Sequence, residues 1–169
     1  TFVYVDDTEG WKNVQDSTSN AVGNPFLVAT GGTITTSGDC KIHTFTGPGT
    51  FTVTSASATA AENVVSYLVV AGGGGAGSGS GGGGGGGAGG FREVKSPLTP
   101  YTASPLDGYP NSPNRITVTA QAYPIAVGGG GAGQPGPSSD SGDGVSGAVS
   151  TFSTITSAGG GFGAGQGGG

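Results

Sequence analysis

Short stretches of this chain alternate apolar and polar residues, and longer stretches between them carry almost no side chains. Residues 50–54 alternate so that Phe51 and Val53 share one face, and residues 41–46 alternate in the same way. Successive side chains of a strand point to opposite faces, so each stretch predicts a strand with one buried face. The Gly-Pro-Gly sequence between them is typical of a turn, and we predict a hairpin over residues 41–54.

Other segments rich in β-branched and aromatic residues predict further strands, at residues 2–5, 11–14, 26–30, 33–36, 116–119, 123–127 and 148–156. Residues 64–71 are apolar nearly throughout, which predicts a strand buried on both faces. The proline-rich residues 96–113 predict a turn-rich excursion, held by Leu98, Tyr101, Leu106 and Tyr109. Turns are predicted at residues 6–10 and 37–39, and a polar loop at 134–147.

Glycine dominates three blocks that each follow on an apolar, β-prone run. Every residue from 72 to 90 is glycine, alanine or serine, and shorter blocks begin at Gly128 and Gly159. Glycine loses more backbone entropy on folding than any other residue, so an ordered chain with 40 glycines in 169 residues must recover that loss through backbone packing. Extended glycine strands can approach closely because they lack Cβ atoms, and polyproline-II strands find their hydrogen-bond partners on other strands.

We therefore predict that the blocks pack against one another or against those of a neighbouring subunit, through Gly72, Gly73, Gly74, Gly75, Gly84, Gly128, Gly129, Gly130, Gly131, Gly159, Gly160 and Gly161. A flexible linker is the competing interpretation, because Gly/Ser-rich segments commonly behave as random coils. The recurrence of the strand–glycine junction favours packing. The predicted fold class is all-β, with short antiparallel strands, packed polyproline-II-like glycine strands and almost no helix.

The charge of the chain restricts its partners. Charged residues make up 9% of the sequence, against about 25% in typical domains, and the net charge is −5. The five basic residues form no cluster, so we expect no binding to nucleic acid. No apolar run approaches the roughly 18 residues of a membrane span, so we expect no membrane insertion.

Catalytic and cofactor motifs are weak. Gly72, Gly74 and Gly77 match the dinucleotide-binding GxGxxG pattern after a predicted strand. The glycines that follow disfavour the helix whose N-terminus would bind the pyrophosphate. His43 is the only histidine and Cys40 the only cysteine, so we expect neither a catalytic triad nor a Cys/His zinc site. The chain is therefore predicted to be no enzyme and to carry no cofactor.

Two further residue groups have a structural and a functional interpretation. Asp140 and Asp143 lie close in sequence, but their spacing fails the EF-hand pattern, so a solvated loop without metal is expected. Trp11, Tyr101 and Tyr109 could stack on sugars, although aromatic residues that anchor turns against proline are commoner.

Three segments occur in an order that carries a resemblance: IHTFTGPGTFTV at 42–53, YLVVAGGGG at 67–75 and FSTITSAGGG at 152–161. Together they resemble the glycine-rich domain of tailed-phage tail fibres and related viral or extracellular fibre proteins. The resemblance covers roughly residues 40–169, and residues 1–39 look like the end of a preceding fibre module. The chain is expected to continue beyond residue 169.

The resemblance implies a structural subunit of a viral tail fibre or extracellular filament, located in the virion or outside the cell, with no enzymatic activity. The thin core of side chains and the exposed strand edges predict a homo-oligomer, either a trimeric fibre or a helical filament. The alternative is a receptor-binding tip that displays loops to a host cell-surface receptor or glycan. The candidate receptor loop comprises Gln134, Ser138, Ser139, Asp140 and Asp143.

Overall fold

The computed structural model describes residues 2–4, 11–13, 26–109, 113–135 and 142–165. These residues are nearly all β, which confirms the predicted fold class. The only helical element among them is the short 3-10 turn η1 (Ala60–Asn63). Strands β1 (Phe2–Tyr4) and β2 (Trp11–Asn13) form a separate antiparallel pair, and the predicted turn at 6–10 lies outside the described residues.

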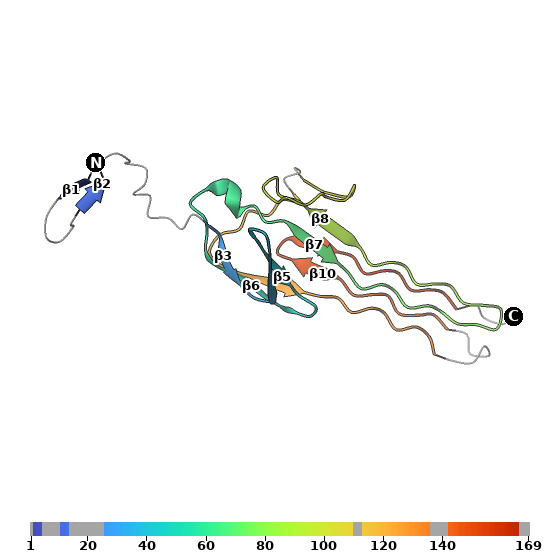
Figure 1. Ribbon diagram of the computed structural model, residues 1–169. Coiled ribbons are helices and arrows are strands. Elements are labelled where there is room, and N and C mark those ends of the chain that lie inside the picture. Colours follow the sequence, from blue (N-terminus) through green and yellow to red (C-terminus); the bar gives the residue numbers. More distant parts are fainter. Residues whose placement is uncertain (1, 5–10, 14–25, 110–112, 136–141, 166–169) are drawn as a thin grey trace.

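A five-stranded antiparallel sheet forms the body of the molecule (Figure 1). Its strand order is β11-β10-β9-β6-β3, with β3 at Val28–Thr30, β6 at Gly49–Ser55, β9 at Ala122–Ala126, β10 at Ser150–Phe152 and β11 at Ile155–Ser157. Alternation along β6 buries Phe51 and Val53, as the sequence pattern predicts.

The predicted hairpin over residues 41–54 is wrong, because β5 (Cys40–Thr44) pairs with β4 (Thr33–Ser37) and not with β6. The loop between β4 and β5 is Gly38-Asp39, and Gly38 has a φ of 56°. Two-residue hairpin loops need such a positive φ, so this predicted turn, and not Gly-Pro-Gly, joins the pair.

Strands β7 (Tyr67–Val70) and β8 (Phe91–Val94) form a third two-stranded antiparallel pair, which packs against β10 and β11. Val69 and Val94 are buried, whereas Leu68 and Val70 are 60% and 51% exposed. The prediction that residues 64–71 are buried on both faces is therefore wrong. A two-stranded sheet covered on one side only leaves every second side chain exposed.

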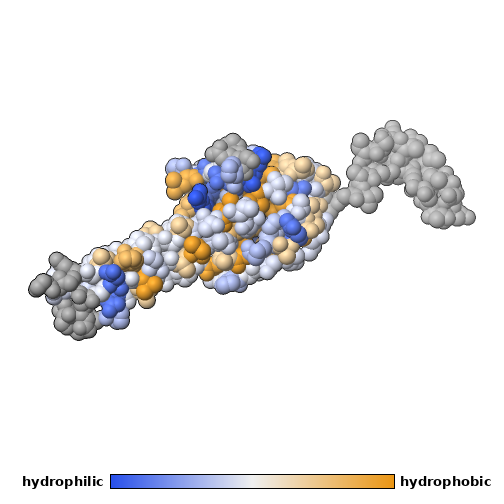
Figure 2. All heavy atoms as spheres, turned by 180° about the vertical axis from the view of Figure 1, so that it is seen from behind, coloured by the Kyte–Doolittle hydropathy of each residue, from blue (hydrophilic) through white to orange (hydrophobic). Residues whose placement is uncertain are grey.

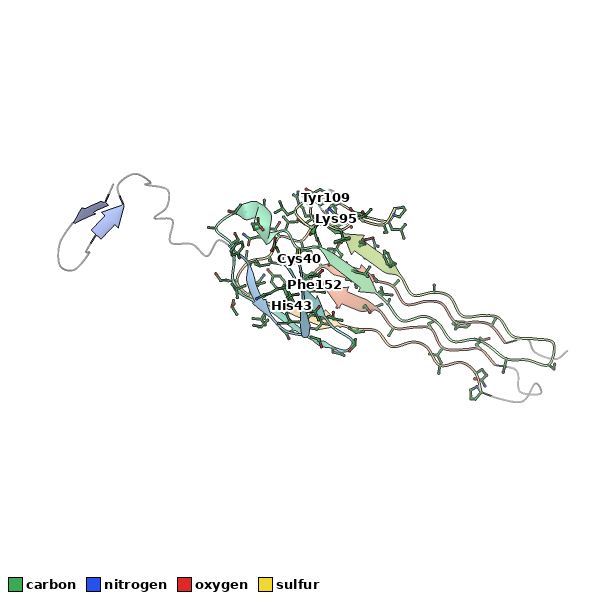
Figure 3. The ribbon with its side chains drawn as sticks, viewed as in Figure 1. Cys40, His43, Lys95, Tyr109 and Phe152 are labelled. Carbon is green, nitrogen blue, oxygen red and sulfur yellow. The ribbon has the colours of Figure 1, made fainter. Side chains whose placement is uncertain are left out.

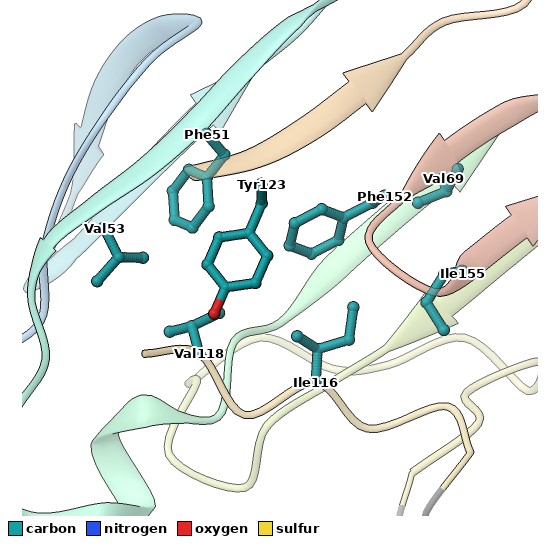
Figure 4. Close-up of a cluster of buried hydrophobic side chains, with 8 residues drawn as sticks. All are labelled: Phe51, Val53, Val69, Ile116, Val118, Tyr123, Phe152 and Ile155. Atoms are coloured by element: carbon teal, nitrogen blue, oxygen red, sulfur yellow. The ribbon is translucent and has the colours of Figure 1, made fainter. Parts of the chain in front are cut away.

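An aromatic cluster fills the space between the sheets (Figure 4). The Phe152 ring meets the rings of Phe51, Tyr67 and Tyr123 at centroid distances of 6.1, 5.8 and 6.2 Å, each close to edge-on. Ile116 and Val118 close the cluster from a segment that makes only one isolated bridge, so the predicted strand at 116–119 does not form. Edge-to-face ring pairs add to the stability that burial provides.

Two other sequence expectations are corrected. Residues 148–156 do not form one strand, because the chain reverses between β10 and β11 at Ser153, which has a φ of 53°. The excursion at 96–109 is turn-rich as predicted, but Leu98 and Leu106 are exposed and do not hold it. Polar contacts hold it instead: Ser66 with Thr99, Glu93 with Ser104, and Asp107 with the Lys95 backbone.

Truncation of the central ring tests the position of the core. The Phe152→Ala variant should lose about 3–5 kcal/mol of unfolding free energy, because it removes three ring contacts and leaves a cavity. Urea denaturation measures this loss. Leu98→Ala, at a residue that is 52% exposed, is the control and should change stability by less than about 0.5 kcal/mol. Equal losses in both variants would contradict the core described above.

Candidate functional site: the glycine bundle

Five extended segments leave the body side by side as a long bundle (Figure 1). We name them glycine strands I (residues 71–78), II (83–90), III (128–134), IV (142–149) and V (158–165). Strands I, III and V continue β7, β9 and β11, while strands II and IV lead into β8 and β10. Each glycine strand is therefore positioned by a strand of the body.

Hydrogen bonds within the bundle repeat every three residues. In strand I, the N–H groups of Ala71, Gly74 and Gly77 donate to strand II, at Gly90, Gly87 and Gly84. The N–H groups one residue further along, at Gly72, Gly75 and Ser78, donate to the carbonyls of Ala148, Val145 and Gly142 in strand IV. Three residues per turn without internal hydrogen bonds is the geometry of polyproline II. The glycine blocks thus pack against one another and do not form a linker.

Strand I is the centre of the bundle. Besides its bonds to strands II and IV, it accepts bonds from strand III at the carbonyls of Gly73 and Ala76, and from strand V at those of Gly72 and Gly75. Further bonds join strand II to V, V to IV and IV to III. Strands III and V run parallel to strand I, and strands II and IV run antiparallel to it, as the register of these bonds shows.

The inner positions have no room for a side chain. A Cβ atom added at Gly72, Gly75, Gly160 or Gly163 would lie less than 3.0 Å from the backbone of another glycine strand. The same holds at every third residue of strand II, at Gly83, Gly86 and Gly89. Real Cβ contacts are essentially never that short, so these glycines are required by close approach of backbones.

A second set of positions faces outward and tolerates a Cβ. Gly85, Gly129 and Gly161 have nothing within 4 Å of an added Cβ. Three residues further along each strand, on the same outward side, lie Ala88, Ala132 and Ala164, which are all exposed. Alanine therefore occurs where the three-residue period turns the Cβ away from neighbouring strands.

The predicted packing residues fall into two groups. A Cβ added at Gly84 would lie 3.0 Å from the Ala164 nitrogen, and an added Cβ would meet another backbone at Gly72, Gly74, Gly75, Gly128, Gly131, Gly159 and Gly160. By contrast, a Cβ added at Gly73 or Gly130 would make only ordinary contacts, and one added at Gly129 or Gly161 would make none. The sequence therefore predicts the glycine blocks, but not which glycines within a block face inward.

Strand IV was missed, because residues 134–147 were predicted to be a polar loop. Gly144 and Gly147 face strand I at a spacing of three, and that spacing is the signal which could have revealed the strand. Val145 and Val149 are 57% and 51% exposed, so strand IV carries its larger side chains on the outside. The bundle in Figure 2 is mostly pale, with scattered hydrophobic residues and a strongly hydrophilic patch near its far end.

The far end of the bundle contains the described part of the candidate receptor loop. Gln134 ends strand III, where its N–H donates to the carbonyl of Ala76. Asp143 begins strand IV, and one of its carboxylate oxygens accepts the N–H of Gly165 at 2.8 Å, which joins strands IV and V. Ser138, Ser139 and Asp140 lie outside the described residues. The turn at 79–82 closes strands I and II at the same end, with Gly82 at a φ of 120°.

The other chemical candidates occupy structural positions. His43 Nδ1 lies 2.8 Å from the carbonyl oxygen of Gly31, and its ring packs edge-on against Phe51 at 5.0 Å. Figure 3 shows His43 and Cys40 within the body, where side chains are dense, in contrast to the bundle. The GxGxxG residues lie in glycine strand I, where no helix follows.

The described residues lack two further features. They contain no cluster of three or more His, Cys, Asp or Glu side chains arranged to hold a metal ion. Within the same residues, no helix has the length and apolar character required to cross a membrane.

Comparison with known families identifies the class of the domain. The family model of the glycine-rich domain matches residues 44–169, which is most of the chain, so the chain belongs to this family. No curated protein and no solved structure matches it significantly.

Alanine substitutions at the two kinds of glycine should have opposite effects. Gly75→Ala should destabilise the protein by more than about 1 kcal/mol, because its Cβ would meet the Ala132 backbone. Gly161→Ala should stabilise it by about 0.4–1 kcal/mol, because the site is open and the unfolded chain loses freedom. Thermal unfolding of both variants measures the difference.

Gly85→Ala and Gly129→Ala provide matched controls in strands II and III, since both sites are open as well. They should behave like Gly161→Ala. If Gly75→Ala were as stable as these variants, the strands would not be in close contact and the bundle geometry would be wrong.

Proposed function

We propose that the chain is a structural module of a virion or extracellular fibre, in which the glycine bundle acts as a projecting rod. One observation carries this proposal: five glycine strands continue the body and bond to one another along their length. The chain enters the body near β3, at the end opposite the bundle (Figure 1). Such a module separates what precedes β3 from what lies at the far end of the rod.

The chemistry of the rod suits an exposed position outside the cell. Backbone hydrogen bonds hold it, and the described glycine strands contain a single charged residue, Asp143. The resemblance to tail-fibre sequences supports the fibre context, and it falls largely on the residues that match the glycine-rich domain family. No step in this function requires catalysis or a cofactor.

Self-association is the second part of the proposal. Strand β3 is an edge of the five-stranded sheet, and unpaired strand edges are templates for pairing with another chain. In strand I, the N–H groups of Gly73 and Ala76 have no partner in the described part of the chain. We infer a homo-oligomer, either a trimeric fibre or a helical filament, because the edge of β3 and these N–H groups offer hydrogen bonds to another copy.

A receptor-binding tip is the second candidate function. It is favoured by the meeting of the 79–82 turn, Gln134 and Asp143 at the far end of the bundle. Loops at the end of a rigid scaffold are common binding positions. The partner in this case would be a host cell-surface receptor or glycan.

Electron microscopy of the native assembly, labelled at the chain, distinguishes the two functions. Labels repeated along a filament are the result expected for a structural subunit. A single label at the end of a fibre would instead support the receptor-binding tip. Labels absent from any fibre would exclude both.

Sedimentation of the purified chain tests self-association separately. We expect trimers or larger assemblies at micromolar concentration. A well-folded monomer under these conditions would overturn the oligomer proposal. Circular dichroism on the same sample controls for folding, since the protein should show almost no helical signal.

A further inference from the structure

Two adjoining hollows flank Arg92 at the edge of the body. The first has a volume of about 260 Å³ and is lined by Arg92, Asn114, Thr154 and Thr156, among others. The second, of about 160 Å³, is lined by the same Arg92 and Asn114 together with Tyr67, Phe91, Glu93 and Leu106, among others. Because both hollows share the arginine and the asparagine, a ligand that spans them would contact both side chains.

The Arg92 guanidinium is free to bind a ligand. Within the described part of the chain, it makes no hydrogen bond or ion pair. The neighbouring carboxylates are already engaged: Glu93 accepts bonds from Ser104, and Asp107 accepts the backbone N–H groups of Lys95 and Tyr109. A guanidinium presents five donors in a planar fork that matches a carboxylate.

Hydrogen bonds fix the walls of the hollows. The Tyr67 hydroxyl donates to the backbone carbonyl of Asn114, and the Gly108 N–H donates to the carbonyl of Glu93 at 2.9 Å. Burial raises the pKa of the Tyr67 phenol, the charge of Arg92 lowers it and the charge of Asp107 raises it, so the phenol experiences the fields of both charged groups. The site is therefore a built part of the body.

The lining combines polar and apolar groups. Thr154, Thr156 and Asn114 offer hydroxyl and amide groups, whereas Phe91 and Leu106 are 41% and 68% exposed on the other side. A sugar ring presents hydroxyl groups together with apolar C–H faces, so it matches both kinds of wall. We propose that this site binds an acidic saccharide. Its carboxylate pairs with Arg92 on the side of the first hollow, which no carboxylate lines, and its hydroxyl groups bond to Asn114 and the threonines.

The proposal does not depend on the fibre role, because the hollows lie on the body and not on the bundle. Glucuronic acid is the probe, titrated into ¹⁵N-labelled protein while the Arg92 Nε–H and the surrounding amide signals are followed by NMR. We expect saturable shifts around both hollows. Arg92→Gln should weaken binding about 10-fold or more, because it removes a charged hydrogen-bonding pair.

Arg115→Gln is the matched control, since it removes the same charge next to Asn114 from a residue that lines neither hollow. It should leave the affinity unchanged, and Arg92→Lys should retain only part of it. Backbone spectra of the free variants verify that they fold.

Three results would overturn the proposal. Glucose that binds as well as glucuronic acid would show that the carboxylate is not recognised. Inorganic phosphate that produces the same shifts and competes equally would reduce the site to an adventitious ion only. No saturable shift at tens of millimolar glucuronic acid would exclude the site altogether.

Discussion

The glycine strands of this protein hold their places chiefly through backbone contact: bonds to each neighbouring strand recur every third residue, and the inward positions have no space for a Cβ atom. Fixing each residue costs about 1–2 kcal/mol in backbone entropy, and glycine has the most to lose. The net contribution of one hydrogen bond to stability is only about 1 kcal/mol. Strand I compensates by bonding to all four other glycine strands. The rest of the bundle depends on that arrangement.

The body provides the alignment that the bundle cannot provide for itself. Every glycine strand continues or precedes a paired β-strand, so the aromatic core sets the spacing at which the glycine strands begin. Two buried serines reinforce the junction. Ser157 Oγ donates to the carbonyl of Val69 at 2.8 Å, and Ser150 Oγ accepts the N–H of Gly128 at 2.9 Å. Side-chain bonds thus hold the base of the bundle, whereas beyond the base backbone bonds join the strands, with the Asp143–Gly165 bond added at the far end.

The sequence predicted what depends on local pattern. Alternation located β6 and its buried Phe51 and Val53, and the glycine blocks indicated packed extended strands. The pairing of strands was harder to predict from local pattern, because β6 bonds to β3 and β9, which are distant in sequence. The sequence also did not show which glycines of each strand face inward. Within a run of identical glycines, only the neighbours in space distinguish the required Gly160 from the open Gly161.

The Arg92 site was invisible to sequence reasoning for a related reason. Arg92, Asn114 and Thr154 lie far apart in the chain, and no motif connects them. Their position on the body follows from the architecture. A bundle that excludes inward Cβ atoms has no side chains with which to line a pocket, and its outward positions are mostly glycine and alanine. Apart from outward side chains such as Val145 and Val149, the side chains that could contact a ligand therefore lie on the body and in the loops at the far end of the bundle. The glycine strands between these regions can vary only at outward positions without losing their contacts.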